Sequence, residues 1–140
     1  MIKSKQLQVG NDAERFVKDI FKKYGFWAYN TPKSKDGSQP VDIVAMKDNI
    51  NWLLDVKHVR TEEISFDFSR IEANQLTCMD YARNFAGVKR LGFAIVFERT
   101  NRCYYMTYDK YLELKAQGRK SVRFDELLTL EDHINDRSKN

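Results

Sequence analysis

The sequence predicts an α/β fold in which helices flank a central mixed sheet, in the order helix, three strands, helix, two strands, helix. Three observations carry this prediction. Apolar residues recur at helical spacing over 13–24, two β-branched-rich runs flank a short polar break within 41–57, and 91–97 is continuously apolar. These patterns are typical of an amphipathic helix, a β-hairpin and a buried strand.

The boundaries of the elements follow from local signals. Gly10-Asn11-Asp12 offers an N-cap for the first helix, which should end before Gly25. Residues 26–31 are typical of a first strand, and 32–40 have the composition of a loop. Further along we expect an alternating segment at 64–68, a helix from 69 or 70 to 85, strands at 91–97 and 102–107, a helix at 108–117 and a short strand at 121–124.

Composition indicates a folded globular protein. Of the 140 residues, 42% are hydrophobic and 13% aromatic, which favours one domain over 1–130. The last ten residues, 131–140, lack apolar content and predict a flexible tail. No run of 18 apolar residues, signal-peptide pattern or nucleotide-binding loop is present. We therefore expect a cytoplasmic protein with no membrane contact and no nucleotide cofactor.

The net charge of +4 arises from clusters of Lys and Arg, most of them at the ends of predicted elements. Such clusters are either a solvated surface or contacts to a phosphate backbone. Charge alone favours the first interpretation. The second gains weight only if the clusters surround a site whose chemistry needs phosphates.

The hairpin places three charged residues among apolar neighbours. A two-residue turn at Asp48 and Asn49 would put Asp42 opposite Asp55. Lys57 would then lie on the same face, because strand side chains alternate. A four-residue loop would instead put Asp42 opposite Lys57, and a three-residue loop would break the arrangement.

Two adjacent carboxylates repel each other, so this arrangement predicts a cation between Asp42 and Asp55. Oxygen ligands completed by water suit Mg²⁺, with Mn²⁺ as a substitute. Lys57 can orient an attacking water, and the Val56 backbone carbonyl can reach the metal while its side chain packs in the core. The competing interpretation is a surface salt bridge, which is common for Asp-x-Lys on a strand.

Other candidates are ambiguous from the residues alone. For Glu14 the residues alone favour a first-turn acid that stabilises the helix dipole over a third acidic group of the site, and Gln75 faces solvent by default. Lys33, Ser34 and Lys35 either bind a phosphate or cap a turn.

Several motifs together resemble the PD-(D/E)XK nuclease core, which has a restriction-endonuclease-like fold, and specifically the Holliday junction resolvases of the RecU-like type. The motifs that carry this resemblance span roughly 10–128: Gly10-x-x-x-Glu14, Gly25-Phe26, Pro40-Val41-Asp42-Ile43-Val44-Ala45, Leu54-Asp55-Val56-Lys57, 66–75 and 92–97. The resemblance implies a Mg²⁺-dependent endonuclease that acts as a homodimer on four-way DNA, in recombination, repair or phage DNA processing.

The resemblance also assigns roles to residues. It implies catalysis by Glu14, Asp42, Asp55, Lys57 and Gln75, and metal binding by Asp42, Asp55, Val56 and Glu14. The basic clusters then become candidate DNA contacts, through Lys33, Ser34, Lys35, Arg60, Lys89 and Arg90.

Two departures from the RecU-like pattern matter. Asp55 stands where Glu is usual, and loop 32–40 is too short for the projecting stalk, which suggests a compact, phage-borne variant. The alternatives are a PD-(D/E)XK nuclease with a restriction or repair target, and an inactive DNA-binding module. The dimer surface is not visible in the sequence, where Trp27, Tyr29 and Phe66 are candidates for either an interface or the core.

Overall fold

The structure is a computed structural model that describes residues 11–33, 35 and 41–136. In chain order the elements are α1 (Asn11–Lys23), β1 (Trp27–Asn30), β2 (Ile43–Lys47), β3 (Ile50–Val59), β4 (Ser65–Asp67), the 3₁₀ helix η2 (Phe68–Arg70), α2 (Ala73–Asn84), β5 (Arg90–Phe97), β6 (Arg102–Thr107), α3 (Tyr108–Ala116), β7 (Ser121–Arg123), the 3₁₀ helix η3 (Phe124–Glu126) and α4 (Leu130–Asn135).

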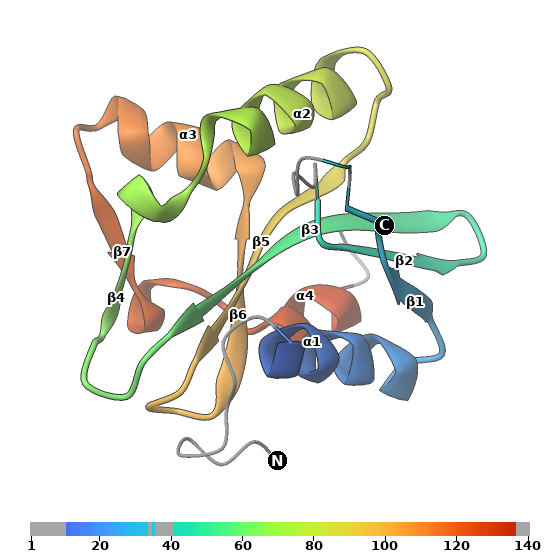
Figure 1. Ribbon diagram of the computed structural model, residues 1–140, viewed down its shortest axis with the longest axis horizontal. Coiled ribbons are helices and arrows are strands. Elements are labelled where there is room, and N and C mark those ends of the chain that lie inside the picture. The colour runs from blue at the N-terminus through green and yellow to red at the C-terminus, as the bar shows by residue number, and fades with distance from the viewer. Residues whose placement is uncertain (1–10, 34, 36–40, 137–140) are drawn as a thin grey trace.

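A five-stranded sheet in the order β1-β2-β3-β5-β6 forms the middle layer. Strands β3 and β5 run parallel, and the other neighbouring pairs of this sheet are antiparallel. Helices α2 and α3 lie on one side of the sheet and α1 and α4 on the other (Figure 1), while β4 and β7 form a separate two-stranded sheet. The predicted α/β class with a mixed central sheet is confirmed.

Each side of the sheet has its own hydrophobic core. Phe93 and Ile95 belong to the core under α2 and α3, whereas Leu54 and Ala94 belong to the core under α1 and α4. Because strand side chains alternate between faces, Asp55 lies on the side opposite Leu54. The charged residues of β3 that matter for chemistry therefore point toward α2.

The β2–β3 hairpin turns at Asp48 and Asn49, with Lys47 paired to Ile50. Asp48 has a φ of 55°, a left-handed conformation that Asp tolerates better than most residues. The two-residue turn is therefore confirmed, and the three- and four-residue alternatives are wrong.

The helix that carries Gln75 begins later than the sequence predicts. Residues 68–70 form η2, where the Asp67 carboxylate accepts a hydrogen bond from the Ser69 N–H (2.8 Å). Ile71 is extended and buried in the α2-side core, and α2 starts only at Ala73. Burial of Ile71 thus separates a short turn from the helix proper.

The end of the chain also differs from the prediction of a flexible tail from residue 131, because 130–135 form α4. The Thr129 hydroxyl caps this helix by accepting a hydrogen bond from the Asp132 N–H (3.1 Å). Leu130 is buried in the α1-side core, and Glu131 forms an ion pair with Lys23 (2.5 Å). The buried Leu130 and the Lys23–Glu131 ion pair thus attach this segment to the rest of the fold, although it has little apolar content. In the described part of the chain, no helix is long and apolar enough to cross a membrane.

Replacing Leu130 by Ala should lower the free energy of unfolding by about 2–4 kcal/mol, because it leaves a cavity where the side chain is 0% exposed. Leu128→Ala is the matched control: this side chain is 57% exposed, and its loss should cost less than about 0.5 kcal/mol. Urea unfolding measures both variants. Equal effects of the two substitutions would mean that α4 is not part of the cooperative fold.

Candidate active site

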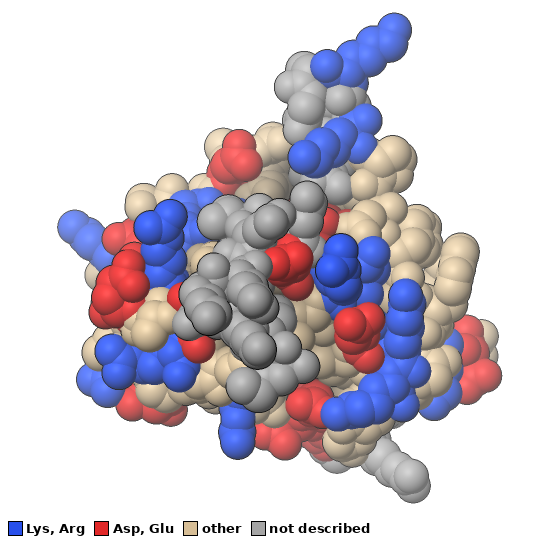
Figure 2. Space-filling view, turned by 60° about the horizontal axis from the view of Figure 1, so that its bottom comes forward, with Lys and Arg blue, Asp and Glu red and all other residues tan. Residues whose placement is uncertain are grey.

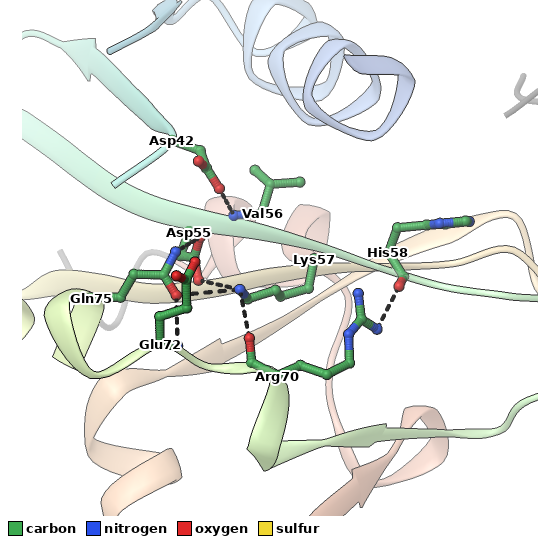
Figure 3. A network of polar contacts seen from close by, with 8 residues as sticks. All are labelled: Asp42, Asp55, Val56, Lys57, His58, Arg70, Glu72 and Gln75. Atoms are coloured by element: carbon green, nitrogen blue, oxygen red, sulfur yellow. Dashed lines mark hydrogen bonds and ion pairs between the residues drawn. The ribbon is translucent and has the colours of Figure 1, made fainter. Parts of the chain in front are cut away.

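Asp42 lies immediately before β2, at the point where regular pairing with β3 ends. The last ladder pair is Ile43 with Leu54, and the Asp42 N–H donates to the Leu54 carbonyl (2.9 Å). The Asp42 carboxylate then accepts a hydrogen bond from the Val56 N–H through Oδ2 (2.7 Å), as Figure 3 shows. The side chain of Asp42 therefore takes the place of the missing strand partner of Val56.

Asp55 is a fully buried carboxylate on β3. Its Oδ1 accepts a hydrogen bond from the Gln75 side chain (2.9 Å), and its Oδ2 forms an ion pair with the Lys57 ammonium (3.1 Å). Apart from this ion pair, Oδ2 has no hydrogen-bond donor among the described residues. Burial raises the pKa of Asp55 well above its usual range, and the Asp42 carboxylate adds to this effect while Lys57 opposes it. The charge of ionised Asp55 is thus compensated by the protein only in part.

The Lys57 ammonium is held by several acceptors from different parts of the chain. Besides its ion pair with Asp55, the ammonium donates hydrogen bonds to the backbone carbonyl of Arg70 (3.1 Å) and to Oε1 of Gln75 (3.3 Å). Lys57 is thereby fixed between β3, η2 and α2 (Figure 3).

Gln75 is buried, in contrast to the default interpretation from sequence that it faces solvent. Its Oε1 also accepts a hydrogen bond from the Glu72 N–H (3.1 Å) in the first turn of α2, while its Nε2 donates to Asp55. The amide therefore bridges Asp55 and Lys57 and is itself held by the helix N-terminus. The late start of α2 matters here, since it places Gln75 three residues after the N-cap Glu72.

Glu14 lies on α1 and is half-buried, with its carboxylate accepting a hydrogen bond from the Asn30 side chain. Burial raises the pKa of Glu14, Asp42 raises it further, and Lys33 and Lys18 oppose the shift. The Asp42 carboxylate thus raises the pKa of both Glu14 and Asp55. Asp42 therefore lies within electrostatic reach of both of the other acids.

The described residues contain no group of three His, Cys, Asp or Glu side chains close enough to hold a metal among them. A cation here would instead have two carboxylates, Asp42 and Asp55, with water and a backbone carbonyl. The N–H and C=O of one strand residue point to the same side, so the Val56 carbonyl faces the edge where Asp42 lies. Together with the Oδ2 of Asp55, which within the described part of the chain contacts only the Lys57 ammonium, these oxygens fit a hard divalent cation.

The predicted DNA-binding residues fall into separate places. Lys33 and Lys35 are exposed in the loop after β1, with Lys33 near Glu14, while Ser34 lies outside the described residues. Arg60 is exposed just after β3 and lines a pocket of about 210 Å³ with His58, Glu63 and Arg70.

Lys89 and Arg90 lie at the start of β5, in a different region. Lys89 lines a pocket of about 290 Å³ whose other walls come from the end of α2 and the start of α3. Arg90 is paired with Trp52, three positions before the residue pair that contains Asp55. On the described part of the face in Figure 2, Lys and Arg side chains form several groups separated by Asp and Glu.

Sequence reasoning missed Arg70, whose carbonyl holds Lys57 and whose guanidinium donates to the His58 carbonyl (2.7 Å). In the sequence, Ser69-Arg70 is only a candidate helix start. No local signal shows that this segment folds back onto β3.

The fold and the pairing of two carboxylates with a lysine on one hairpin define a class, the nucleases of the PD-(D/E)XK type. Within that class the chain belongs to the archaeal Holliday junction resolvase (Hjc) family, whose model matches residues 5–139. It is accordingly a metal-dependent nuclease that resolves Holliday junctions.

Among solved structures, the chain is similar to Hjc of Archaeoglobus fulgidus, a Holliday junction resolvase from an archaeal hyperthermophile, with a TM-score of 0.61. The match covers 85% of this chain and 93% of the other at 19% sequence identity, so it supports the fold. No curated protein matches this chain in sequence. The predicted superfamily and junction-resolving function are confirmed, whereas the RecU-like type and a phage origin stay predictions.

Replacing Asp42 by Asn removes one of two adjacent carboxylates but keeps an oxygen that accepts the Val56 N–H. In EDTA we expect the free energy of unfolding to rise by about 1 kcal/mol, because the buried charge of Asp55 then meets less repulsion. Asp19→Asn, which removes an exposed carboxylate from α1, is the matched control and should change it by less than about 0.5 kcal/mol. Urea unfolding at neutral pH gives both values, and a loss of more than about 2 kcal/mol in Asp42→Asn would argue for a mainly structural Asp42.

Proposed function

We propose that the chain cleaves four-way DNA at the hairpin site through Glu14, Asp42, Asp55, Lys57 and Gln75, with Mg²⁺ as the metal and Mn²⁺ as a substitute. One observation carries this proposal: Asp55 is fully buried beside Asp42, and among the described residues the Lys57 ammonium, 3.1 Å away, is the one cation or donor that contacts its Oδ2. Burying such a carboxylate costs free energy unless a cation compensates its charge.

Asp42, Asp55 and the Val56 carbonyl would hold the ion, with Glu14 on α1 as a further acidic candidate ligand close to Asp42. A divalent cation supplies Lewis-acid polarisation of the scissile phosphodiester. The protein's part is to present these oxygens in fixed positions. The β2–β3 pairing sets the backbone of Asp55 and Val56, and the Val56 N–H orients Asp42.

Lys57 orients the attacking water and stabilises the negative charge that develops on the phosphate. Its ammonium is suited to this role because Asp55, Gln75 and the Arg70 carbonyl keep it in place. Gln75 acts as a positioning residue, since its amide touches both Asp55 and Lys57.

DNA would be held by basic side chains that approach the site from two directions. Lys33 and Lys35 lie in the loop after β1, with Lys33 near Glu14, and Arg60 lies beyond the end of β3. Ser34, Lys89 and Arg90 remain candidates for more distant phosphate contacts. Recognition through phosphates suits a branched substrate, which is defined by its shape rather than its base sequence.

Two symmetric cuts require two active sites, so we propose a homodimer. Trp27 and Tyr29 support it: they are 63% and 36% exposed, and their rings contact each other on edge strand β1 (4.8 Å between centroids). Tyr29 is paired with Val44 and thus faces the α2 side of the sheet. Phe66 is fully buried and belongs to the core.

A second exposed aromatic pair, Tyr81 on α2 and Phe85 directly after it, lies on the same side of the sheet (5.2 Å between centroids). Two such apolar surfaces on one protomer suit a two-fold interface, in which each surface of one copy covers a surface of the other.

The decisive test is incubation with a four-way junction, a linear duplex and a flap, in Mg²⁺ and in EDTA. We expect paired nicks placed symmetrically about the branch, in Mg²⁺ only. Asp42→Asn and Asp55→Asn should each slow cleavage by more than about a thousandfold while junction binding in EDTA is retained, because binding rests on phosphate contacts. Lys57→Ala should also slow cleavage yet keep the Mg²⁺-dependent rise in melting temperature, since its ammonium is not a ligand.

Asp19→Asn is the control and should cut normally. Wild-type rates in both carboxylate variants would contradict the hairpin site. Efficient cutting of linear duplex at one sequence would favour a restriction-type target instead.

Trp27→Glu should convert the dimer into a monomer, because it places a charge in the apolar surface. Light scattering coupled to size-exclusion chromatography measures the mass, and product mapping should show single nicks in place of paired ones. Leu128→Glu, at another exposed apolar residue, is the control and should stay dimeric. A wild-type protein that is monomeric yet makes paired nicks would contradict the proposal.

A further inference from the structure

Arg70 occupies the last position of η2 and joins three parts of the molecule. Its backbone carbonyl accepts a hydrogen bond from the Lys57 ammonium (3.1 Å), and its guanidinium donates through Nη1 to the His58 carbonyl (2.7 Å). The guanidinium also lies over the ring of Phe66 (5.4 Å to the centroid). The side chain therefore lies along the end of β3, one residue past Lys57.

Within the described part of the chain, most of the hydrogen-bonding capacity of this guanidinium is unused. An Arg side chain has five N–H donors, and one of them is engaged with His58. Among the described residues, no carboxylate forms an ion pair with Arg70, although its charge contributes to the lowered pKa of Asp67 after the hydrogen bonds from Ser69. Arg70 is exposed, so an anion from solution can reach it.

The surroundings of Arg70 form a small pocket with an excess of positive charge. His58, Arg60, Glu63 and Arg70 line a volume of about 210 Å³ at the end of β3. His58 is turned to Glu98 (2.9 Å), so its ring is already paired. Two guanidinium groups against the single carboxylate of Glu63 leave the pocket cationic.

We propose that this pocket binds a backbone phosphate of the DNA next to the scissile one, with Arg70 and Arg60 as its donors. The proposal rests on the proposed function. The planar guanidinium presents paired donors that match phosphate oxygens. The Arg70 carbonyl also accepts a hydrogen bond from Lys57. Arg70 would therefore bind the neighbouring phosphate and at the same time act as a positioning residue for Lys57, which acts on the scissile phosphate.

Binding is measured in EDTA with the Asp42→Asn background, so that no cleavage interferes. Adding Arg70→Gln should reduce the slope of log affinity against log salt by about 0.9, which is one phosphate contact. Over a tenfold rise in salt the affinity should then fall about eightfold less. Arg70→Lys should keep the slope, because it keeps the charge. Arg83→Gln, at the other end of α2 and paired with Asp109 (2.6 Å), is the control and should leave the slope unchanged.

A second measurement identifies the phosphate. Junctions carry a neutral methylphosphonate at one position at a time on either side of the cut. One position should weaken binding in the Asp42→Asn background but cause no further loss once Arg70→Gln is added. Arg60 is exposed, so Arg60→Gln should not disturb folding. In this variant, too, a methylphosphonate at the same position should cause no further loss of binding. If the losses add at every position and the salt slope does not change, the pocket assignment is wrong.

The effect on Lys57 is read from cleavage at saturating junction, in an otherwise wild-type chain. Arg70→Lys keeps the salt slope but loses the planar guanidinium with its paired donors. This variant should still cleave about tenfold more slowly than wild type. Full-rate cleavage by this variant would overturn the positioning role. If wild-type protein neither binds nor cuts junctions, the proposed function fails instead, so the two failures are distinguishable.

Discussion

A carboxylate with no exposure to water, Asp55 at the centre of the sheet, is the constraint on which the rest of the site depends. Strand β3 is hydrogen-bonded to β2 on one side and β5 on the other, so its backbone cannot move to bring this side chain into solvent. The charge must be balanced where it is. Lys57 and Gln75 provide that balance only in part, because the pKa of Asp55 is still raised by burial and by Asp42.

The same constraint explains why three separate elements converge on one short segment of β3. Lys57 would be mobile on its own, and it is held by acceptors from η2 and α2. Gln75 can reach Asp55 because α2 begins only after the extended Ile71, which is buried in the core. Packing of apolar residues on the α2 side of the sheet is thus what fixes the polar contacts, and the site inherits its rigidity from that core.

The family match and the local geometry support each other at different levels. The match over 5–139 identifies the chain as a member of the archaeal Holliday junction resolvase family, and the likeness to the Archaeoglobus fulgidus enzyme at 19% identity supports the sheet and its helices. Neither comparison says which side chains act. That assignment rests on burial, hydrogen bonds and charge in this chain, and it gives Arg70, invisible in the sequence pattern, a place between Lys57 and the end of β3.

The sequence by itself determined the hairpin and the common face of Asp55 and Lys57, because alternation acts between neighbours in the chain. It left the length of the turn open, and the structure shows the two-residue turn. It also indicated the fold class and most element boundaries. It did not determine the burial of Gln75, the contacts of Arg70 or the docking of α4, which the sequence predicts as a tail. Each of these depends on residues far apart in the chain: Gln75 meets Asp55, Arg70 meets His58, and Glu131 meets Lys23. Only tertiary packing brings such partners together, because periodicity records which face of an element is apolar and not what that face packs against.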